Sequence, residues 1–537
     1  MQRPHAAGAV LQALEPLAQK IAELELQALE GKATNIVSMM GELAKSLAAA
    51  GREAVELVLD QAARAPQRCI CTKCNMEASS HGFEATSFIG RFGLIKVTMR
   101  RMRCATCRRS WLPLDEAWAL PEGGYADDVR EATERLACRM PFREAVEELE
   151  HLWLVAPDPS TAKRWILRDG DRADQAAVAD AQEQWREHER KTQAVASGEE
   201  RSQERTAGFG VVEVDGVMVL AWKPGQEPRR KTQGEKQAGE NEPTTLKPAA
   251  SDVDAEGRAA NHQPPSTLSQ VQGSPMGPIG RSPRVHGREI CMGITYLDEH
   301  VCEESPGRGL LLERRYVGSL NDRDGFWLKL HDAAAAQGVL SKQHVVRVSD
   351  GGAYFIDHSA ELFSDQPLVG ILDIQHAKQH VWETGHKLTA DKDETRAWVS
   401  PHTEAIRNGH VGAVIIDLAK ERERRTGTKQ KEAIAQLHGY LDRHKTLMDY
   451  PRYKAAGYPL ASAAIESTNK RLAGRRLKQG GMIWSEPGVE AMLASRVAFY
   501  NPGTWTRLWP HLKLIFDSLA GARRGNGEKH EWFRGGR

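Results

Sequence analysis

The spacing of hydrophobic and polar positions changes several times along the chain, and each change predicts a different kind of element. Residues 9–65 carry apolar side chains at helical spacing, for example Leu14 and Ile21, and predict two or three helices. Residues 124–170 return to this spacing and predict a helix, a turn that contains proline and a second helix, which is the order of a helix-turn-helix. A polar helix is expected to follow to about residue 205.

From residue 211 the apolar positions become continuous or alternate, which predicts strands rather than helices. The strand-like stretches are VVEVDGVMVLAW, REICMGITYL, LLLERRYVGSL, HVVRVSDGGAYF and PLVGILDIQHAKQHVW. A helix is expected at 323–337, between the third and fourth stretches, and residues 387–450 and 460–500 are expected to be helical. This order predicts a mixed β-sheet with helices on both of its faces.

Between the first two strands lie residues 223–285, which are rich in Pro, Gly, Gln, Ser and Glu. Such a composition cannot bury enough apolar surface to offset chain entropy, so a disordered insertion within a hairpin is expected. The predicted parts of the chain are an N-terminal helical region (1–65), a cysteine-containing segment (66–115), a helical region (120–205), a mixed core (206–500) with a helical insertion (387–455), and a basic tail (501–537).

Composition narrows the class of protein. A chain of 537 residues that is 40% hydrophobic and 27% charged is expected to be soluble and to form several domains. It has no run of about 18 apolar residues and no secretory signal at its N-terminus, so we expect a cytoplasmic protein without a membrane span.

Charge is concentrated in two regions, although the net charge is only +1. Residues 62–110 hold ten Lys or Arg against two Asp or Glu, and residues 470–537 hold thirteen against five. Such regions are typical of a protein that binds a polyanion, and two solvated basic surfaces are an equally good explanation of the charge alone.

The cysteines predict a metal site. Five of the eight lie close together, in CTKC (Cys71, Cys74), in CATC (Cys104, Cys107) and at Cys69. Two CxxC pairs can hold one tetrahedral, structural Zn²⁺, and the alternating stretch between them predicts the hairpin of a zinc ribbon. Cys69 is able to replace Cys71, and unpaired buried thiols are the alternative to a zinc site.

Four acidic residues lie at positions where a bound divalent cation would account for the presence of a carboxylate. Asp215 lies inside an apolar strand, where an isolated carboxylate is costly. Asp350 and Asp373 each follow an apolar strand, and Glu466 lies on a predicted helix. Carboxylates at strand ends can converge across a sheet and suit Mg²⁺ or Mn²⁺, and a pair of such ions can promote phosphodiester cleavage. For any one aspartate, a loop cap or an ion pair is the alternative.

Five stretches in order over about residues 69–500 resemble the transposases of the bacterial ISKra insertion-sequence family, distant relatives of the mutator-like DDE enzymes. They are CTKC…RRMRCATCRRSWLPLDEAWAL, VEVDGVMV, VVRVSDGGAYF, ILDIQHAKQHVWE and MDYPRYKAAGYPLASAAIESTNKRLAGRRLKQGGMIWS. The resemblance implies a multidomain α+β protein with N-terminal helices, a zinc ribbon, a DNA-binding segment like a helix-turn-helix, and an RNase H-like α/β catalytic core with an all-helical insertion.

The resemblance also implies roles for individual residues. By motif, Asp215 in VDG, Asp350 in SDG and Glu466 in IES form a catalytic triad that binds magnesium or manganese, with two ions expected. Asp373 and His376 in LDIQH match a D-x-x-H element with a supporting role; Asp373 is also a rival for the second triad position, and a buried structural histidine is the alternative for His376. The implied reaction cleaves DNA at the element ends and transfers the freed 3′-hydroxyl into target DNA.

Double-stranded DNA is the expected partner, at the element ends and at the target, and two ends imply a homo-oligomer on DNA in the nucleoid. The basic residues expected to contact it are Arg100, Arg101 and Arg103 in the ribbon, Lys163 and Arg164 in a helix capped by Ser160, and Lys470, Arg471, Arg475, Arg476 and Lys478 after the catalytic glutamate. A zinc-containing DNA-binding regulator without catalysis is the alternative, and a nuclease without strand transfer would share the same site.

Overall fold

The computed structural model describes residues 4–30, 36–64, 69–113, 121, 124–199, 204–223, 285–305, 308–479, 482–501 and 503–509. Across these residues the protein is a mixed α+β structure that contains several sheets. Nearly all of the predicted insertion at 223–285 and most of the predicted tail at 501–537 lie outside the described residues.

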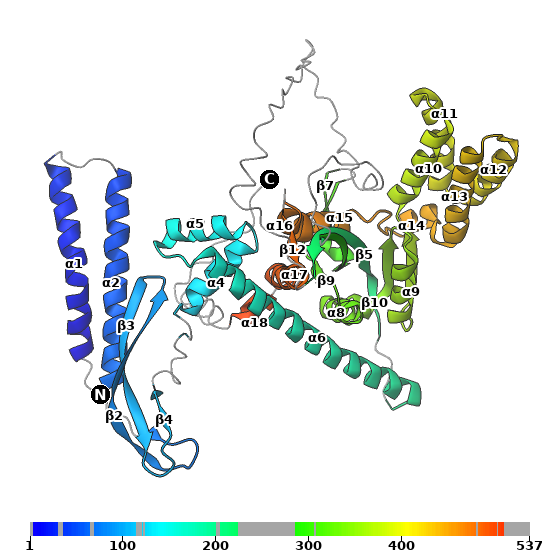
Figure 1. Ribbon diagram of the computed structural model, residues 1–537. Helices are drawn as coiled ribbons and strands as arrows, with labels where there is room; N and C mark the ends of the chain where they lie inside the picture. The colour runs from blue at the N-terminus through cyan, green and yellow to red at the C-terminus, as the bar shows by residue number, and fades with distance from the viewer. Residues whose placement is uncertain are drawn as a thin grey trace.

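The N-terminal helices form a hairpin that packs on the cysteine segment (Figure 1). Helices α1 (Pro4–Leu29) and α2 (Ile36–Arg64) confirm the predicted helical spacing. Leu59 of α2 shares a small core with Ile95 and Val97 of the adjacent sheet. That sheet has the order β1-β2-β3-β4, with strands Cys69–Ile70, Glu77–Gly90, Gly93–Cys104 and Ser110–Trp111. Strands β2 and β3 are antiparallel, so the predicted hairpin between the CxxC pairs is confirmed.

Three helices follow: α4 (Asp127–Ala137), α5 (Phe142–Trp153) and α6 (Pro159–Ser197). The turn between α5 and α6 agrees with the predicted helix-turn-helix order. Helix α6 continues without a break through the polar segment that was expected to be a separate helix. Its cap is Asp158 rather than Ser160, and the Asp158 carboxylate accepts the backbone N–H of Ser160 at 2.8 Å. The helix starts two residues earlier than predicted because Pro159 suits the first helical position.

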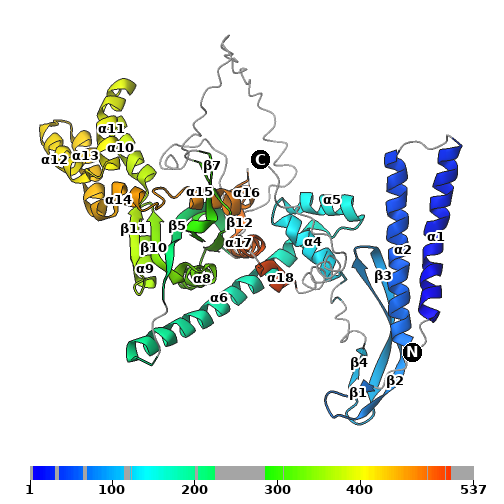
Figure 2. The same cartoon turned by 180° about the vertical axis from the view of Figure 1, so that it is seen from behind.

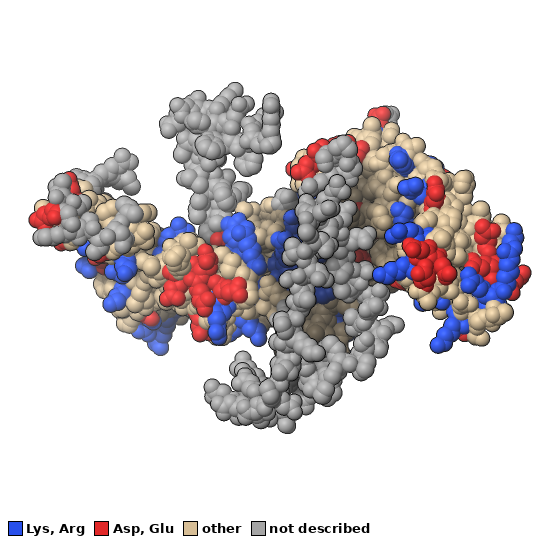
Figure 3. Space-filling model, turned by 90° about the horizontal axis from the view of Figure 1, so that it is seen from above, with Lys and Arg blue, Asp and Glu red and all other residues tan. Residues whose placement is uncertain are grey.

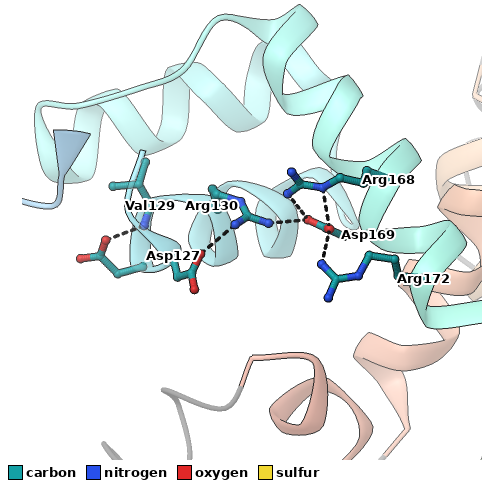
Figure 4. A network of polar contacts seen from close by, with 7 residues as sticks. Asp127, Val129, Arg130, Arg168, Asp169 and Arg172 are labelled. Carbon is teal, nitrogen blue, oxygen red and sulfur yellow. Dashed lines mark hydrogen bonds and ion pairs between the residues drawn. The ribbon is translucent and has the colours of Figure 1, made fainter. Parts of the chain in front are cut away.

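An ionic network ties α6 to α4 (Figure 4). Asp169 of α6 accepts hydrogen bonds from Arg168 at 2.9 Å and from Arg130 of α4 at 2.8 Å, and Arg172 lies 3.5 Å from it. Burial opposes the ionisation of Asp169, but hydrogen bonds from Arg168, Glu134 and Arg130 prevail and lower its pKa to about 2. Burial and the nearby Asp169 carboxylate raise the pKa of Glu134 well above its ordinary value.

The largest sheet has six strands in the order β11-β10-β5-β6-β9, with β12 paired to β5. Strand β6 is antiparallel to its two neighbours, β5 and β9, whereas β10 is parallel to both β5 and β11. The bounds are β5 (Thr206–Trp222), β6 (His286–Leu297), β9 (Arg315–Ser319), β10 (Lys342–Ser349), β11 (Leu368–Leu372) and β12 (Trp484–Ser485). The predicted strand LLLERRYVGSL is instead two: β8 (Arg308–Leu311) pairs with β7 (Val301–Ser305) in a separate sheet, and only β9 joins the large one.

Helices cover both faces of the large sheet, as predicted. Helices α8 (Arg323–Gln337) and α9 (Ala353–Leu362) share a core with Val212 and Val214 of β5. The opposite face packs against the last helices of the core, and Val211 shares a core there with Leu472 and Met492. These elements are α15 (Ala463–Asn469), a π-helical turn (Lys470–Gly474), α16 (Arg475–Leu477) and α17 (Glu486–Tyr500). Because side chains alternate along a strand, Glu213 and Asp215 point to this second face.

A group of helices separates β11 from α15 in the chain and lies at one end of the molecule in both views (Figures 1 and 2). Its members are α10 (Ile374–Leu388), α11 (Lys392–Arg407), α12 (Val411–Arg424), α13 (Thr428–His444) and α14 (Tyr450–Ala455). The remaining short elements are α18 (Thr504–Leu508) and 3-10 turns at Asp298–His300, Val339–Ser341 and Lys445–Leu447. In the described part of the chain, every helix is too short or too polar to cross a membrane.

Candidate active site and metal centres

The register of the sheet brings the three predicted aspartates to one level. Strand β10 lies between β5 and β11 and is parallel to both. Continuing the register past the end of β10 sets Asp350 level with Asp215 on one side and with Asp373 on the other. The pairs nearest to the site are Val348 with Glu213 and Ser349 with Leu372. Because neighbouring strands lie about 4.8 Å apart, three carboxylates occupy adjacent strands where β10 and β11 end.

Asp215 is half-buried and bonded through both of its carboxylate oxygens. Oδ1 accepts the backbone N–H of Gly216 at 2.7 Å, and Oδ2 accepts the side-chain amide of Asn469 at 2.6 Å. Burial, and after it the nearby Asp350 carboxylate, raise the pKa of Asp215 to about 6, although His376 and both hydrogen bonds oppose the rise. A positive charge bound between the two aspartates would therefore stabilise their ionised forms.

Helix α15 carries Glu466 to the same place. Asn469, which binds Asp215, lies three residues after Glu466, and residues with this spacing share one face of a helix. The Glu466 side chain is exposed, and one of its oxygens lies within 4.8 Å of ligand atoms of Asp373 and His376. The group that the structure brings together as a possible metal site is thus Asp373, His376 and Glu466, with Asp215 and Asp350 on the adjoining strands.

Asp373 has the contacts of an orienting residue. Its side chain is buried, and Oδ1 accepts the backbone N–H groups of Gln375 at 2.5 Å and of His376 at 3.3 Å, which caps α10. Oδ2 accepts the backbone N–H of Ser462 at 2.8 Å and also its hydroxyl. Asp373 therefore joins the start of α10 to the segment before α15, whereas Asp350 remains half-exposed at the end of its strand. Both aspartates stay candidates for the second triad position, because the structure groups Asp373 rather than Asp350 with Glu466.

Two residues of this region are absent from the set expected on sequence grounds. Asn469 bonds to Asp215, as described above, and Glu213 is buried two residues before Asp215. Glu213 accepts the hydroxyl of Tyr296 at 2.7 Å and the backbone N–H of Ile465 at 2.8 Å. The sequence held a signal for each of them. Glu213 is a second acid in VVEVDG, spaced so that it shares a strand face with Asp215, and Asn469 is an amide about one helical turn after Glu466.

The four predicted zinc ligands converge. The ligand atoms of Cys71, Cys74, Cys104 and Cys107 all lie within 4.8 Å of one another. The Sγ atoms of Cys71 and Cys107, and those of Cys74 and Cys104, are 3.4 Å apart. Zinc–sulfur bonds of about 2.3 Å in a tetrahedron require sulfur atoms about 3.8 Å apart. The set fits a closed zinc site, and Cys69 lies outside it.

Most of the predicted DNA-contacting residues are exposed, but their surroundings differ. The exposed ones are Arg103, Lys163, Arg164, Lys470, Arg475 and Lys478. Arg100 donates to the backbone carbonyl of Arg64, Arg101 pairs with Glu84, and Arg471 donates to the Tyr316 hydroxyl. On the face seen from above, Lys and Arg side chains form several groups with acidic groups between them (Figure 3).

Arg476 does not fit the prediction of a phosphate contact. It is only 1% exposed, and its Nε donates to the backbone carbonyl of Ala137 at 2.8 Å. Its guanidinium stacks between the rings of Phe142 and Trp484, at 4.7 and 4.8 Å. Arg476 instead joins the helical region to the core, because its position in the fold lies beneath α4 and α5.

No protein-family model and no curated protein matches the chain. The family resemblance therefore stays a prediction that depends on the motifs.

Proposed function

We propose that the protein is a DDE-type DNA transposase like those of the ISKra family, with Asp215, Asp350 and Glu466 as its catalytic carboxylates. One observation carries the proposal. Asp350 is level with Asp215 on the neighbouring parallel strand, and Asn469 binds Asp215 from the helix that bears Glu466. Asp215 and Asp350 thus lie on neighbouring parts of one sheet, and the helix that bears Glu466 contacts the first of them.

The topology supports an RNase H-like catalytic core. Three antiparallel strands, β9, β6 and β5, are extended by the parallel strands β10 and β11, and helices pack on both faces. The helices α10 to α14 separate β11 from α15, at the place in the chain where mutator-like enzymes carry their all-helical insertion before the catalytic Glu.

The residues of the site have different roles in this proposal. Asp215, Asp350 and Glu466 would hold magnesium or manganese, while Asp373 holds the α10 and α15 ends together. Bound cations would offset the negative charge of the carboxylates and supply Lewis-acid chemistry for phosphodiester cleavage. The exposed Lys470, Arg475 and Lys478 would place the DNA backbone by contacts with its phosphates.

DNA recognition is assigned to the N-terminal half. Lys163 and Arg164 are exposed on the first turns of α6, after the turn that follows α5, and Arg103 is exposed on the ribbon. A zinc ion in the four-cysteine site would hold the ribbon in its folded shape. Joining two element ends requires two active sites, so a homo-oligomer on DNA belongs to the proposal.

The test is a cleavage assay with purified protein and a plasmid that carries the chain's own gene with its flanking DNA, in Mg²⁺ or Mn²⁺. Asp215→Ala, Asp350→Ala and Glu466→Ala should each abolish cleavage and leave DNA binding unchanged. Asp417→Ala is the matched control, because Asp417 is exposed on α12 away from these carboxylates.

Two results would change the assignment. Wild-type protein that binds DNA but neither cuts it nor joins strands would support the zinc-containing regulator instead. Cleavage that survives Asp350→Ala and is lost in Asp373→Ala would transfer the second triad position to Asp373.

A further inference from the structure

Helix α15 begins without a cap of its own. Ser462, at its N-cap position, makes no side-chain hydrogen bond to the first turn. Uncapped N–H groups in a buried helix start need partners, because each one left unpaired costs free energy. Here the partners are distant in sequence: Asp373, the cap of α10, accepts the N–H of Ser462, and Glu213 of β5 accepts the N–H of Ile465.

Glu213 is well placed to control the position of Glu466. Its side chain is completely buried, so its location is set by packing rather than by solvent. The backbone N–H that it accepts belongs to Ile465, the residue immediately before Glu466. From the same strand and the same face, Asp215 bonds to Asn469 at the other end of α15. Two acids of β5 therefore hold α15 at both of its ends.

The two hydrogen bonds of Glu213 have different consequences. The bond from Tyr296 links two adjacent strands that the β5–β6 ladder already joins. The bond from Ile465 links the sheet to the helix that bears Glu466, across 252 residues of sequence. Loss of the first should leave α15 in place, whereas loss of the second should release its first turn.

We propose that Glu213 is a positioning residue that sets where α15 presents Glu466 to Asp215 and Asp350. The inference deepens the proposed function and rests on it for the meaning of the carboxylate site, but the contact itself is testable without any activity. Residues that orient metal ligands typically change metal affinity or activity by about 10- to 100-fold when they are replaced.

The experiment compares three variants of the full chain. Glu213→Met keeps the size of the side chain but removes the acceptor. Glu213→Gln keeps an acceptor for the Ile465 N–H, while its amide group can donate to the Tyr296 oxygen. Tyr296→Phe is the matched control, because it also removes one buried hydrogen bond of Glu213 yet leaves the bond to α15. If Glu213→Met does not fold, Glu213→Asp, which is one methylene shorter, takes its place.

Two measurements are made on each folded variant: hydrogen exchange of the amides at 463–469, and Mn²⁺ affinity by isothermal titration calorimetry. Glu213→Met should speed exchange at 463–469 at least about tenfold and weaken Mn²⁺ binding by about 10-fold or more. Glu213→Gln and Tyr296→Phe should leave both within about twofold of wild type. Unchanged exchange at 463–469 in Glu213→Met, or an equal increase in Tyr296→Phe, overturns the positioning role. Wild-type protein that binds no Mn²⁺ would count against the proposed function, and the exchange result would still decide the role of Glu213.

Discussion

Asp169→Asn tests whether the network between α4 and α6 stabilises the helical region. The wild-type carboxylate is held by Arg168 and Arg130 and is largely buried, and its pKa falls from 3.8 to about 2. At about 1.4 kcal/mol for each pKa unit, this shift corresponds to about 2 kcal/mol of unfolding free energy. Because an amide cannot bind the two guanidinium groups as an anion does, the substitution should remove about 2 kcal/mol near pH 7.

The sign of the pH dependence follows from the direction of the shift. A lowered pKa means that the contribution of Asp169 is fully present above its unfolded value of 3.8 and is lost as the pH falls through about 2. Glu134 has the opposite shift: its pKa is raised by burial, so its contribution is present below the unfolded value of 4.5 and is lost as the pH rises through the folded value. At pH 7 the unfolded state of the wild type gains stability by releasing this proton, whereas a glutamine has no proton to release, so Glu134→Gln should raise the stability of the region near pH 7 rather than lower it.

Hydrogen exchange of residues 127–172, recorded at increasing urea concentrations, measures the unfolding free energy of this region. The measurement does not require the whole chain to unfold in one step. The comparison is between wild type, Asp169→Asn and Glu134→Gln at pH 7. Asp169→Asn within about 0.5 kcal/mol of wild type would refute the reasoning, since the ion pairs would then add almost nothing beyond their desolvation cost. A loss of stability in Glu134→Gln would contradict the raised pKa of Glu134.

Three further outcomes are expected. Cys104→Ser should lower the zinc content below the one equivalent per chain expected of the wild type, measured by atomic absorption on freshly reduced protein, and should speed hydrogen exchange across residues 69–111. A zinc content equal to that of the wild type would contradict a four-cysteine site. The pKa of Asp215 is raised to about 6, so Mn²⁺ affinity measured by calorimetry should fall as the pH is lowered below about 6 and should level off above it. An affinity that does not change between pH 5 and 7 would count against Asp215 as a ligand. Arg475→Ala and its neighbour Arg476→Ala should have different effects. The first should weaken DNA binding and reduce its salt dependence in binding titrations, and the second should lower the free energy of unfolding in urea by about 2–4 kcal/mol. The reverse pattern would show that Arg476 faces the DNA.

Local patterns were sufficient for most of the elements. The spacing of leucines predicted α1 and α2, and the alternation between the CxxC pairs predicted the β2–β3 hairpin. The helix expected at 323–337 agrees with α8. Such elements are predictable because their side chains repeat with the period of the element itself. The division of LLLERRYVGSL between two sheets was not predictable, because strand pairing depends on partners elsewhere in the chain.

The chemistry divides in the same way. Cysteine spacing predicted the four-sulfur group, and an acid inside one apolar strand and another at the end of a second predicted that Asp215 and Asp350 would lie near each other in one sheet. The sequence by itself determined these features because ligand type and strand ends are local properties. Only the tertiary structure decided that Asp373 is a buried cap, that Arg476 is inaccessible to DNA and that Glu213 holds α15. Each of those roles depends on burial and on a partner distant in sequence, such as Ala137, which lies 339 residues from Arg476. A side chain's own type does not reveal which partner will surround it, because burial is produced by the packing of the whole chain.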